Sequence, residues 1–311
     1  MECYEPAYWA LLRSGELAVR VEKARAALHD CALCAWACHV DRTRRVGFCR
    51  TGLDAVVSSA FPHRGEEAPL SGHYGSGTIF FSHCNLRCQY CQNYEISQQG
   101  EGVAASSERL AEFMLRLQAA GCHNINFVSP SHVIPQIIEA VYHAAQRGLK
   151  LPLVYNTGGY DSAEGLALLD GIIDIYMPDM KYADAAIARH YSKIRDYPAH
   201  NQAAEREMHR QVGDLALDEY GIARRGLLVR HLVLPDGLAG TAEIVRFLAD
   251  EISPNTYVNI MGQYHPAWRV RERNVPPLNR PVHPDEVAAA RKLAEDAGLR
   301  LDRRRPWVAW F

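Results

Sequence analysis

The sequence predicts an α/β fold in which six βα units form an open, partial TIM-like barrel behind a Cys-rich N-terminal extension. Short apolar runs of β-type residues recur after Ser76, and amphipathic helical patterns lie between them. The chain has 311 residues, a length that α/β barrels use as one domain. A closed barrel needs eight units, so six units indicate a barrel that stays open along one side.

Six short runs are predicted to be the parallel strands. They combine apolar, β-branched and aromatic residues and are bounded by turn-forming or polar residues. The runs are TIFFS (78–82), NINFVS (124–129), PLVYN (152–156), DIYMPD (174–179), LLVRHLVLP (227–235) and YVNIM (257–261).

Helical patterns separate these runs. In SSERLAEFMLRLQAAG, Ser106 or Ser107 can cap the helix, an apolar stripe runs from Leu110 to Leu117, and Gly121 ends it. The same pattern occurs in IPQIIEAVYHAAQRG, AEGLALLDG, AAIARHYSKI, GTAEIVRFLADEI and PDEVAAARKLAEDAG.

Two segments lie outside this alternation. Residues 1–75 are predicted to be an extension with a helix at about 15–29, a Cys-rich stretch and then a loop containing Gly and His. Within the barrel region, 76–311, residues 195–220 insert an extra helix. The last residues, 302–311, carry two Trp and a Phe, and we expect them to dock across the barrel or into a dimer interface.

Charge and composition indicate a cytoplasmic protein. The chain has 34 Lys and Arg against 36 Asp and Glu, which gives no electrostatic sign of nucleic acid or an anionic membrane as partner. The first residues lack the pattern of a signal peptide, and no apolar stretch is long enough to cross a bilayer. Seven of the nine Cys lie in two tight groups, which favours metal binding over disulfides.

The first group to consider places Cys84, Cys88 and Cys91 just after the first predicted strand. Active sites of α/β barrels are built at this end of the strands. Structural zinc takes four protein ligands, so three Cys would need His83 or His63 to complete a zinc site. A [4Fe–4S] cluster accepts three thiolates and leaves one iron open to an exogenous ligand. The spacing therefore favours a cluster.

This motif resembles that of the radical S-adenosylmethionine (SAM) superfamily, which has three Cys in this spacing and an aromatic residue, here Tyr90, before the last. The chain is also similar to the pyruvate formate-lyase activating enzyme-like branch, including members with an added N-terminal Cys cluster. The matching pieces are SHCNLRCQYCQNYEIS, NINFVSPSH, YNTGGY, DIYMPDMKY, RGLLVRHLVLP and YVNIMGQYHP.

The resemblance implies a partial βα barrel and a defined chemistry. The open iron binds the amino and carboxylate groups of SAM, and the reduced cluster passes one electron to the sulfonium. The resulting 5′-deoxyadenosyl radical removes a hydrogen atom from a C–H bond of the substrate. An electron donor such as flavodoxin or ferredoxin is implied as a partner.

The resemblance also implies positions for SAM-binding residues. Tyr90 and Asn93 are expected near the adenine, and Asn156 is expected to contact the ribose or carboxylate. Asp179 and Lys181 are expected to form a charged pair at the barrel mouth, the end of the barrel where SAM would bind. The alternative is that they form only a structural salt bridge. Ser129, Pro130 and His132 occupy the place where many relatives have Gly-Gly-Glu, a departure that affects the amino-group contact; alternatively, His132 caps the following helix.

The second group supplies Cys31, Cys34, Cys38 and Cys49, a complete set of four thiolates. Zinc would make it a structural clip, whereas a second [4Fe–4S] cluster would make it an electron relay or a substrate anchor. We favour the cluster. Trp36 is expected to pack against this group. Arg42, Arg44 and Arg45 lie in its loop and are expected to be solvated.

The predicted substrate is a small molecule or a peptide, because the extension and the insert supply residues to cover the mouth. Gln263, Tyr264 and His265 follow the last strand and are candidates for substrate contacts. One alternative is an activating enzyme that installs a glycyl radical on a partner protein. Another is a non-catalytic iron–sulfur electron carrier. A metal-dependent hydrolase using His63, His73, His132 and His265 is the least favoured, because a paired-His motif is missing.

Overall fold

The computed structural model describes residues 4–302, and its central sheet confirms the predicted partial barrel. Six strands run parallel in chain order, each paired to the next. They are β2 (Ser76–Phe81), β4 (Ile125–Val128), β5 (Leu153–Thr157), β6 (Ile175–Pro178), β8 (Ala223–Leu232) and β9 (Tyr257–Met261). All six predicted runs overlap these strands. The predicted tail, apart from Asp302, lies outside the described residues.

Shorter strands extend the sheet at both edges. β1 (Ala55–His63) pairs antiparallel with β2, and β3 (Val103–Ala105) pairs antiparallel with β1. β10 (Arg300–Leu301) continues the parallel edge beside β9, and β7 (Ala216–Leu217) forms a ribbon with β8. The expectation that residues 55–63 are loop is wrong: the segment gains its hydrogen bonds from β2, a tertiary contact that its Ser-, Pro- and His-containing sequence does not reveal.

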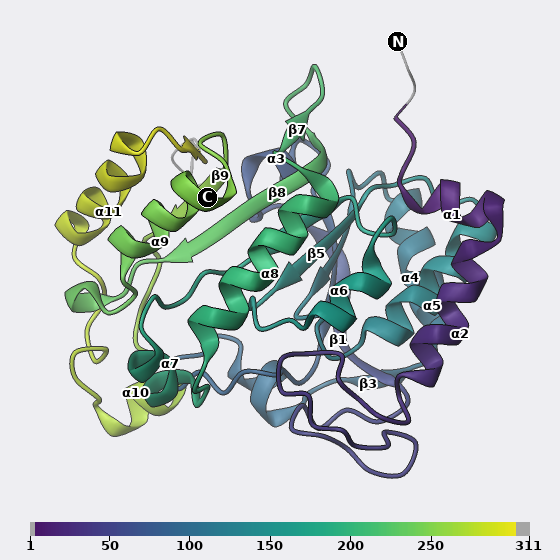
Figure 1. The fold of residues 1–311 in the computed structure, drawn as a ribbon, viewed down its shortest axis with the longest axis horizontal. Coiled ribbons are helices and arrows are strands. Elements are labelled where there is room, and N and C mark those ends of the chain that lie inside the picture. Colours follow the sequence, from purple (N-terminus) through teal and green to yellow (C-terminus); the bar gives the residue numbers. More distant parts are fainter. Residues whose placement is uncertain (1–3, 303–311) are drawn as a thin grey trace.

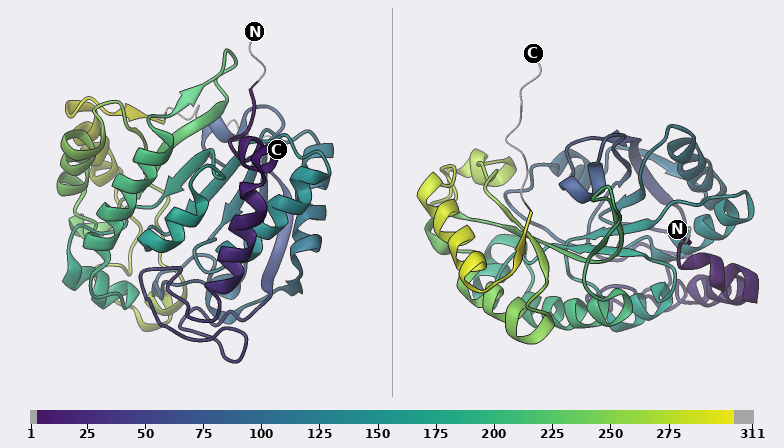
Figure 2. Two further views of the ribbon diagram at one scale, coloured as in Figure 1. Left: turned by 45° about the vertical axis from the view of Figure 1, so that its right-hand side comes forward. Right: turned by 90° about the horizontal axis from the view of Figure 1, so that it is seen from above.

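Helices cover the outer face of the sheet, and Figure 2, seen from above, shows them as an arc around the strands. The predicted helical patterns all form helices. Their bounds are α4 (Ser107–Ala119), α5 (Ile134–Gln146), α6 (Ala163–Leu169), α7 (Ala185–Ser192), α8 (Tyr197–Val212), α9 (Thr241–Phe247) and α11 (Pro284–Asp296). As predicted, Ser106 caps α4 by accepting from the Arg109 amide at 3.3 Å. Short helical turns complete the chain: α3 (Ala68–Ser71), α10 (Trp268–Arg273), η1 (Glu95–Gln99), η2 (Pro235–Gly237) and η3 (Leu248–Ile252).

The helix predicted at about 15–29 corresponds to α2 (Glu16–Ala26), and a further helix that was not predicted, α1 (Tyr8–Ser14), precedes it. They are divided at Gly15, whose φ of 81° is a left-handed conformation that stops the first helix. Tyr8 and Trp9 donate hydrogen bonds to the Leu151 and Leu149 carbonyls, so α1 is fixed to the barrel. Figure 1 shows both helices beside α5.

The helix predicted as an insert, α8, packs on the sheet like the other barrel helices (Figure 1). Met208 and Ala204 join the core between helices and strands. Tyr197, at its first turn, donates to the Asp179 carbonyl at 2.7 Å. The extra helix therefore supports the fourth barrel strand from outside.

The inner face of the sheet is set by the register. Val154 packs with Leu228, Tyr257 and Leu70 of α3, residues from separate parts of the barrel that meet only inside it. Asn126 pairs in register with Val154, and paired residues of parallel strands point to the same face. Asn126 therefore points into the interior, which we call the lumen. The part of the chain described holds no helix long and apolar enough to cross a membrane.

Two buried histidines tie strands to neighbouring loops. His132 and the Ser82 carbonyl are joined at 2.9 Å, and His231 contacts the Met180 carbonyl at 2.8 Å and the Thr241 hydroxyl at 2.9 Å. Burial lowers the pKa of His132 to about 3 and that of His231 to about 4. Both imidazoles are therefore neutral in the folded protein.

These histidines predict a loss of stability in acid. Both imidazoles take up protons below an ordinary pKa of about 6.5 when the chain unfolds, and stability falls until the folded pKa is reached. Between pH 7.5 and 5, each should lower the free energy of unfolding by roughly 2 kcal/mol. Urea unfolding at both pH values measures this. His231→Gln should remove its share of the pH dependence, and an unchanged dependence would contradict the buried neutral state.

Candidate functional site

The loop that carries Cys84, Cys88 and Cys91 leaves β2 at the C-terminal end of the parallel strands. It begins at His83, whose φ of 69° turns the chain sharply away from the strand. The amides of Arg87 and Gln89 donate to the carbonyls of Ser192 and Tyr191 at 3.2 and 2.8 Å. The loop is therefore anchored on the end of α7, across the barrel mouth.

Each of the three sulfurs has a hydrogen-bonding neighbour. The Leu86 amide donates to Cys84 Sγ at 3.3 Å, and the Ser192 hydroxyl donates to Cys88 Sγ at 3.0 Å. Cys91 Sγ lies 3.1 Å from the Ser97 hydroxyl. Donors aimed at sulfur stabilise thiolates bound to a cluster and tune its potential.

Burial keeps the free thiols protonated, but a nearby cation favours their ionised form. Burial raises the pKa of Cys84 to about 12 and also raises that of Cys88. The Lys181 ammonium acts on both thiols in the opposite direction. Metal binding at this loop would thus release protons, and Lys181 would stabilise the thiolates that result.

Lys181 belongs to a charged group at the C-terminal ends of the parallel strands, which we call the upper end of the lumen. Its ammonium lies 2.6 Å from Asp179 Oδ2, and Arg230 Nε donates to Asp179 Oδ1 at 2.9 Å. Arg230 also donates to Asn156 Oδ1 at 2.7 Å. Although burial opposes ionisation, the two cations hold the pKa of Asp179 below its ordinary value. The structure thus brings together Asn156, Asp179 and Lys181; the salt bridge of the alternative is present, and a SAM contact for these residues stays a prediction.

Arg230 is the member of this group that sequence reasoning missed. It lies in β8 within the apolar run LLVRHLVLP. The signal that could have identified it is a charged residue, within an apolar strand, at a position that faces the lumen. Its guanidinium is also 3.9 Å from Glu66 Oε2, at the start of the segment that leads into α3. Two cations and at least two carboxylates therefore surround the upper lumen.

The lower lumen is lined by amides. Asn259 of β9 donates to Glu67 Oε1 at 2.7 Å. Asn126 of β4 is completely buried, and neither its Oδ1 nor its Nδ2 has a hydrogen-bond partner among residues 4–302. Burying an amide in this way costs about 1–3 kcal/mol. The lumen therefore presents an amide that a polar ligand could satisfy.

The other residues predicted to contact SAM lie around the same mouth but differ in exposure. The Tyr90 and Tyr182 hydroxyls share a hydrogen bond of 2.5 Å in a buried cluster, whereas Asn93 is exposed. Ser129 ends β4 with a φ of 60°. His132 is directed at the Ser82 carbonyl, and Val133 is the N-cap residue of α5, so the alternative that His132 caps this helix is wrong.

The residues after β9 also differ in their exposure to solvent. Tyr264 is buried, and its hydroxyl donates to the Leu278 carbonyl at 2.6 Å, so it supports the loop. His265 is exposed and lies 3.2 Å from Gln92, next to Cys91. Gln92 also donates to the Gln263 carbonyl at 3.3 Å. This loop thus borders the three-cysteine loop.

The second cysteine set lies on the βα loops at the same end of the barrel. Cys31, Cys34 and Cys49 are buried and Cys38 is half-buried. The Ala35 amide donates to the Tyr160 carbonyl at 3.4 Å, and the Ser162 hydroxyl donates to the Ala32 carbonyl at 2.7 Å. In Figure 1 these dark purple loops lie below the sheet, close to β3.

Arg42 fastens this segment to the barrel. The expectation that it is solvated is wrong: it is 2% exposed and donates to the Thr51, Gly52 and His132 carbonyls at 3.1, 2.9 and 2.8 Å. Its guanidinium also lies 4.0 Å from Cys31 Sγ. Arg44 and Arg45 are exposed, as predicted. Trp36 stacks on Phe48 with ring centroids 3.7 Å apart, which agrees with its predicted packing role.

The sulfurs are spaced more widely than zinc requires. Thiolates around a zinc ion with Zn–S bonds of about 2.3 Å lie about 3.8 Å apart. Within residues 4–302, no three Cys, His, Asp or Glu ligand atoms from either cysteine set fall within 4.8 Å of one another, and His63, His73, His132 and His265 form no such group. Wider spacing suits a cubane cluster, in which each thiolate binds a different iron.

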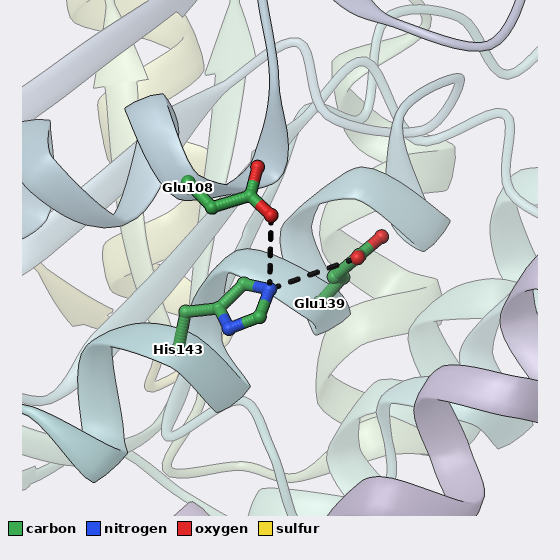
Figure 3. Close-up of side chains that lie close together, drawn as sticks. All are labelled: Glu108, Glu139 and His143. Carbon is green, nitrogen blue, oxygen red and sulfur yellow. Dashed lines mark ion pairs between the residues drawn. The ribbon is translucent and has the colours of Figure 1, made fainter.

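The described residues contain one compact group of ligand atoms, Glu108, Glu139 and His143 on α4 and α5 (Figure 3). His143 Nε2 is 3.7 Å from each carboxylate. Arg25 of α2 forms an ion pair with Glu139, so a cation already neutralises this group. It lies on the outer helices and takes no part in the barrel mouth.

This chain is similar to several known proteins. Residues 78–210 match the model of the Radical SAM superfamily. An uncharacterized protein of Methanocaldococcus jannaschii is 29% identical over 293 residues, covering 92% of this chain and 80% of its own. Among solved structures, a radical SAM methyltransferase from Sphaerobacter thermophilus gives a TM-score of 0.47 at 15% identity, covering 72% of this chain and 64% of that one.

Streptococcus suis SuiB bound to S-adenosylmethionine gives a TM-score of 0.46 at 11% identity, covering 72% of this chain and 51% of that one. The chain thus spans less than two thirds of the length of either structure. The residues that match the Radical SAM superfamily model, 78–210, hold the three-cysteine loop together with β4, β5 and β6.

Proposed function

We propose that this protein is a radical SAM enzyme whose Cys84, Cys88 and Cys91 hold a [4Fe–4S] cluster, and that its substrate is a small polar molecule or a peptide. When bound, the cluster supplies an electron that cleaves SAM to a 5′-deoxyadenosyl radical, which removes a hydrogen atom from the substrate. The observation that carries the proposal is the anchored three-thiol loop at the C-terminal end of the strands, facing Lys181.

The charged group beside the loop supports SAM binding. The Lys181 ammonium acts on the Cys88 thiol, and its charge suits the carboxylate of SAM. Asn156 and Asp179 present an amide and a carboxylate at the same strand ends, which suit hydroxyl and amino groups. Tyr90, Asn93 and Ser129 complete the proposed SAM site, and His132 positions the adjoining loop.

The lumen below this site supports a polar substrate. Its wall carries the Arg230 and Asp179 pair, Asn259 and the unpartnered Asn126. A ligand with hydrogen-bonding groups would satisfy Asn126, whereas an apolar ligand would leave its amide buried and unpaired. The N-terminal segment contacts three βα loops, at Asn85, His132 and Tyr160, which favours a small molecule or a peptide segment as substrate.

We also propose that Cys31, Cys34, Cys38 and Cys49 bind a second [4Fe–4S] cluster. The wide spacing of these sulfurs supports iron–sulfur over zinc. Arg42 supports a metal centre of either kind, because its buried guanidinium forms no ion pair with a carboxylate of the described residues and lies beside Cys31. A thiolate of a cluster would supply the missing negative charge.

Cleavage of SAM tests the main proposal. Protein reconstituted with iron and sulfide under anaerobic conditions and reduced with dithionite should release 5′-deoxyadenosine from SAM, measured by chromatography and mass spectrometry. The triple variant Cys84→Ala, Cys88→Ala, Cys91→Ala should lose this activity at least a thousandfold, because three thiolates hold the cluster. Release of 5′-deoxyadenosine by the triple variant at more than a tenth of the wild-type rate would sink the assignment.

Stability measurements test the role of Asn126. Asn126→Leu should raise the free energy of unfolding by about 1–3 kcal/mol, because it removes an unsatisfied amide. Asn124→Leu is the matched control on the same strand edge: Asn124 accepts from Ser76 at 2.6 Å and donates to the Leu70 carbonyl at 2.9 Å. This control should lower stability. If Asn126→Leu lowers stability as much as the control, the amide has a partner of its own and is not kept for a ligand.

A further inference from the structure

The two cysteine sets meet at one side chain, Arg87. Its guanidinium donates to the carbonyl of Cys84 at 2.9 Å and to that of Phe48, the residue before Cys49. It also lies over the Phe48 ring, 4.5 Å from the centroid. Arg87 thus contacts the backbone of both sets at once.

The charge of Arg87 has no carboxylate to balance it. Within the part of the chain described, Arg87 forms no ion pair with Asp or Glu, and its polar partners are carbonyls and the Gln98 amide. Burial lowers the pKa of Arg87, and the neighbouring thiols act in the opposite direction. These thiols come from both sets: Cys84, Cys49 and Cys88.

A half-buried guanidinium without a counter-charge is costly. Protonated thiols cannot supply that charge, whereas metal-bound thiolates can. The same holds for Arg42 beside Cys31 in the N-terminal set. An arginine without a carboxylate partner thus lies beside each cysteine set. This indicates that both sets are anionic when their metal centres are bound.

The contact between the sets is closed and rigid. Trp36 stacks on Phe48, and its indole Nε1 donates to the Asn85 carbonyl at 2.6 Å, next to Cys84. Asn85 in turn donates to the Tyr160 carbonyl at 2.8 Å. Aromatic stacking and hydrogen bonds to backbone therefore link the two sets.

The N-terminal set differs from the barrel set in having four thiols. A fourth thiolate occupies the fourth iron, so a cluster here would have no corner open to a substrate. What remains for such a cluster is to carry electrons. Cys38 is half-buried, and Arg44, Arg45 and Val46 of the loop between Cys38 and Cys49 are exposed.

Resting on the function proposed above, we propose that the N-terminal set is the electron entry point and that Arg87 couples it to the barrel set. One electron passes from a reduced, low-potential carrier protein with an acidic surface to the N-terminal cluster. The same electron then passes to the barrel cluster, which is reduced as the N-terminal cluster returns to its oxidised state. Arg87 favours the reduced, more negative form of both clusters.

Redox titration followed by EPR spectroscopy tests this coupling without relying on turnover. Arg87→Met should lower the equilibrium constant for reduction of both clusters at least tenfold, which is about 59 mV for a one-electron couple. Arg87→Lys keeps the charge and should restore most of the shift. Arg42→Met, the matched control beside Cys31 alone, should shift only the N-terminal cluster. A shift in neither cluster, or in one alone, for Arg87→Met would overturn the coupling.

The route of the electron is tested with a reduced plant-type ferredoxin as donor. In Cys38→Ala, Cys49→Ala protein, ferredoxin should reduce the barrel cluster at least tenfold more slowly than in wild type, measured by rapid-freeze EPR, and high salt should slow the wild-type reaction. Unchanged rates, or zinc in place of iron at the N-terminal set, would refute the relay while leaving SAM cleavage intact. Absence of the barrel cluster would instead refute the proposed function.

Discussion

A cubane cluster has four irons, and the loop after β2 offers three thiols. In the proposed enzyme, one iron therefore lacks a cysteine ligand, and the other features of the barrel mouth are explained by that iron. The loop has to be held rigidly, which the backbone bonds to the end of α7 achieve. The proposed ligand of the open corner would meet Asp179, Lys181 and Arg230, which lie at the ends of neighbouring strands. In the proposed enzyme, the substrate then fills the lumen below.

Electrostatics connect this site to the rest of the chain. Arg87 and Arg42 lie beside thiols, and neither is balanced by a carboxylate in the described region. Surface arginines in the same molecule behave differently: Arg210 is paired with Asp170 and Glu207, and Arg280 with Asp236 and Glu286. The contrast supports the proposal that Arg87 and Arg42 receive their counter-charge from thiolates of a metal centre.

Much of the fold could be predicted from the sequence because the signals are local. The runs that become β2, β4, β5, β6, β8 and β9 are continuous apolar stretches, as expected for strands covered on both faces. The cap at Ser106 and the stop at Gly121 are likewise encoded within a few residues. β1 was missed because its pairing with β2 is tertiary, and α1 was missed because it lies before the helix predicted at about 15–29.

The candidate site was predictable only where residue type and spacing carry the chemistry. The two cysteine sets could be recognised in this way, and Asp179 and Lys181 could be placed by their position after a strand. The role of Arg230 could be recognised only after knowing which residues of β8 face the lumen. The burial of Arg42 depends on carbonyls that come from Thr51, Gly52 and a separate βα loop. Asn126 stands out only once its missing partners are known. These features arise from packing across the barrel, which local sequence does not report.

The open corner of the barrel cluster is the central claim, and electron–nuclear double resonance addresses it most directly. Reduced protein is mixed with SAM carrying ¹⁵N in its amino group, and the spectrum of the barrel cluster is recorded. A hyperfine coupling between ¹⁵N and the cluster is the predicted result, because the amino group binds the iron that lacks a cysteine. A spectrum without that coupling, under conditions where SAM is bound, would contradict it.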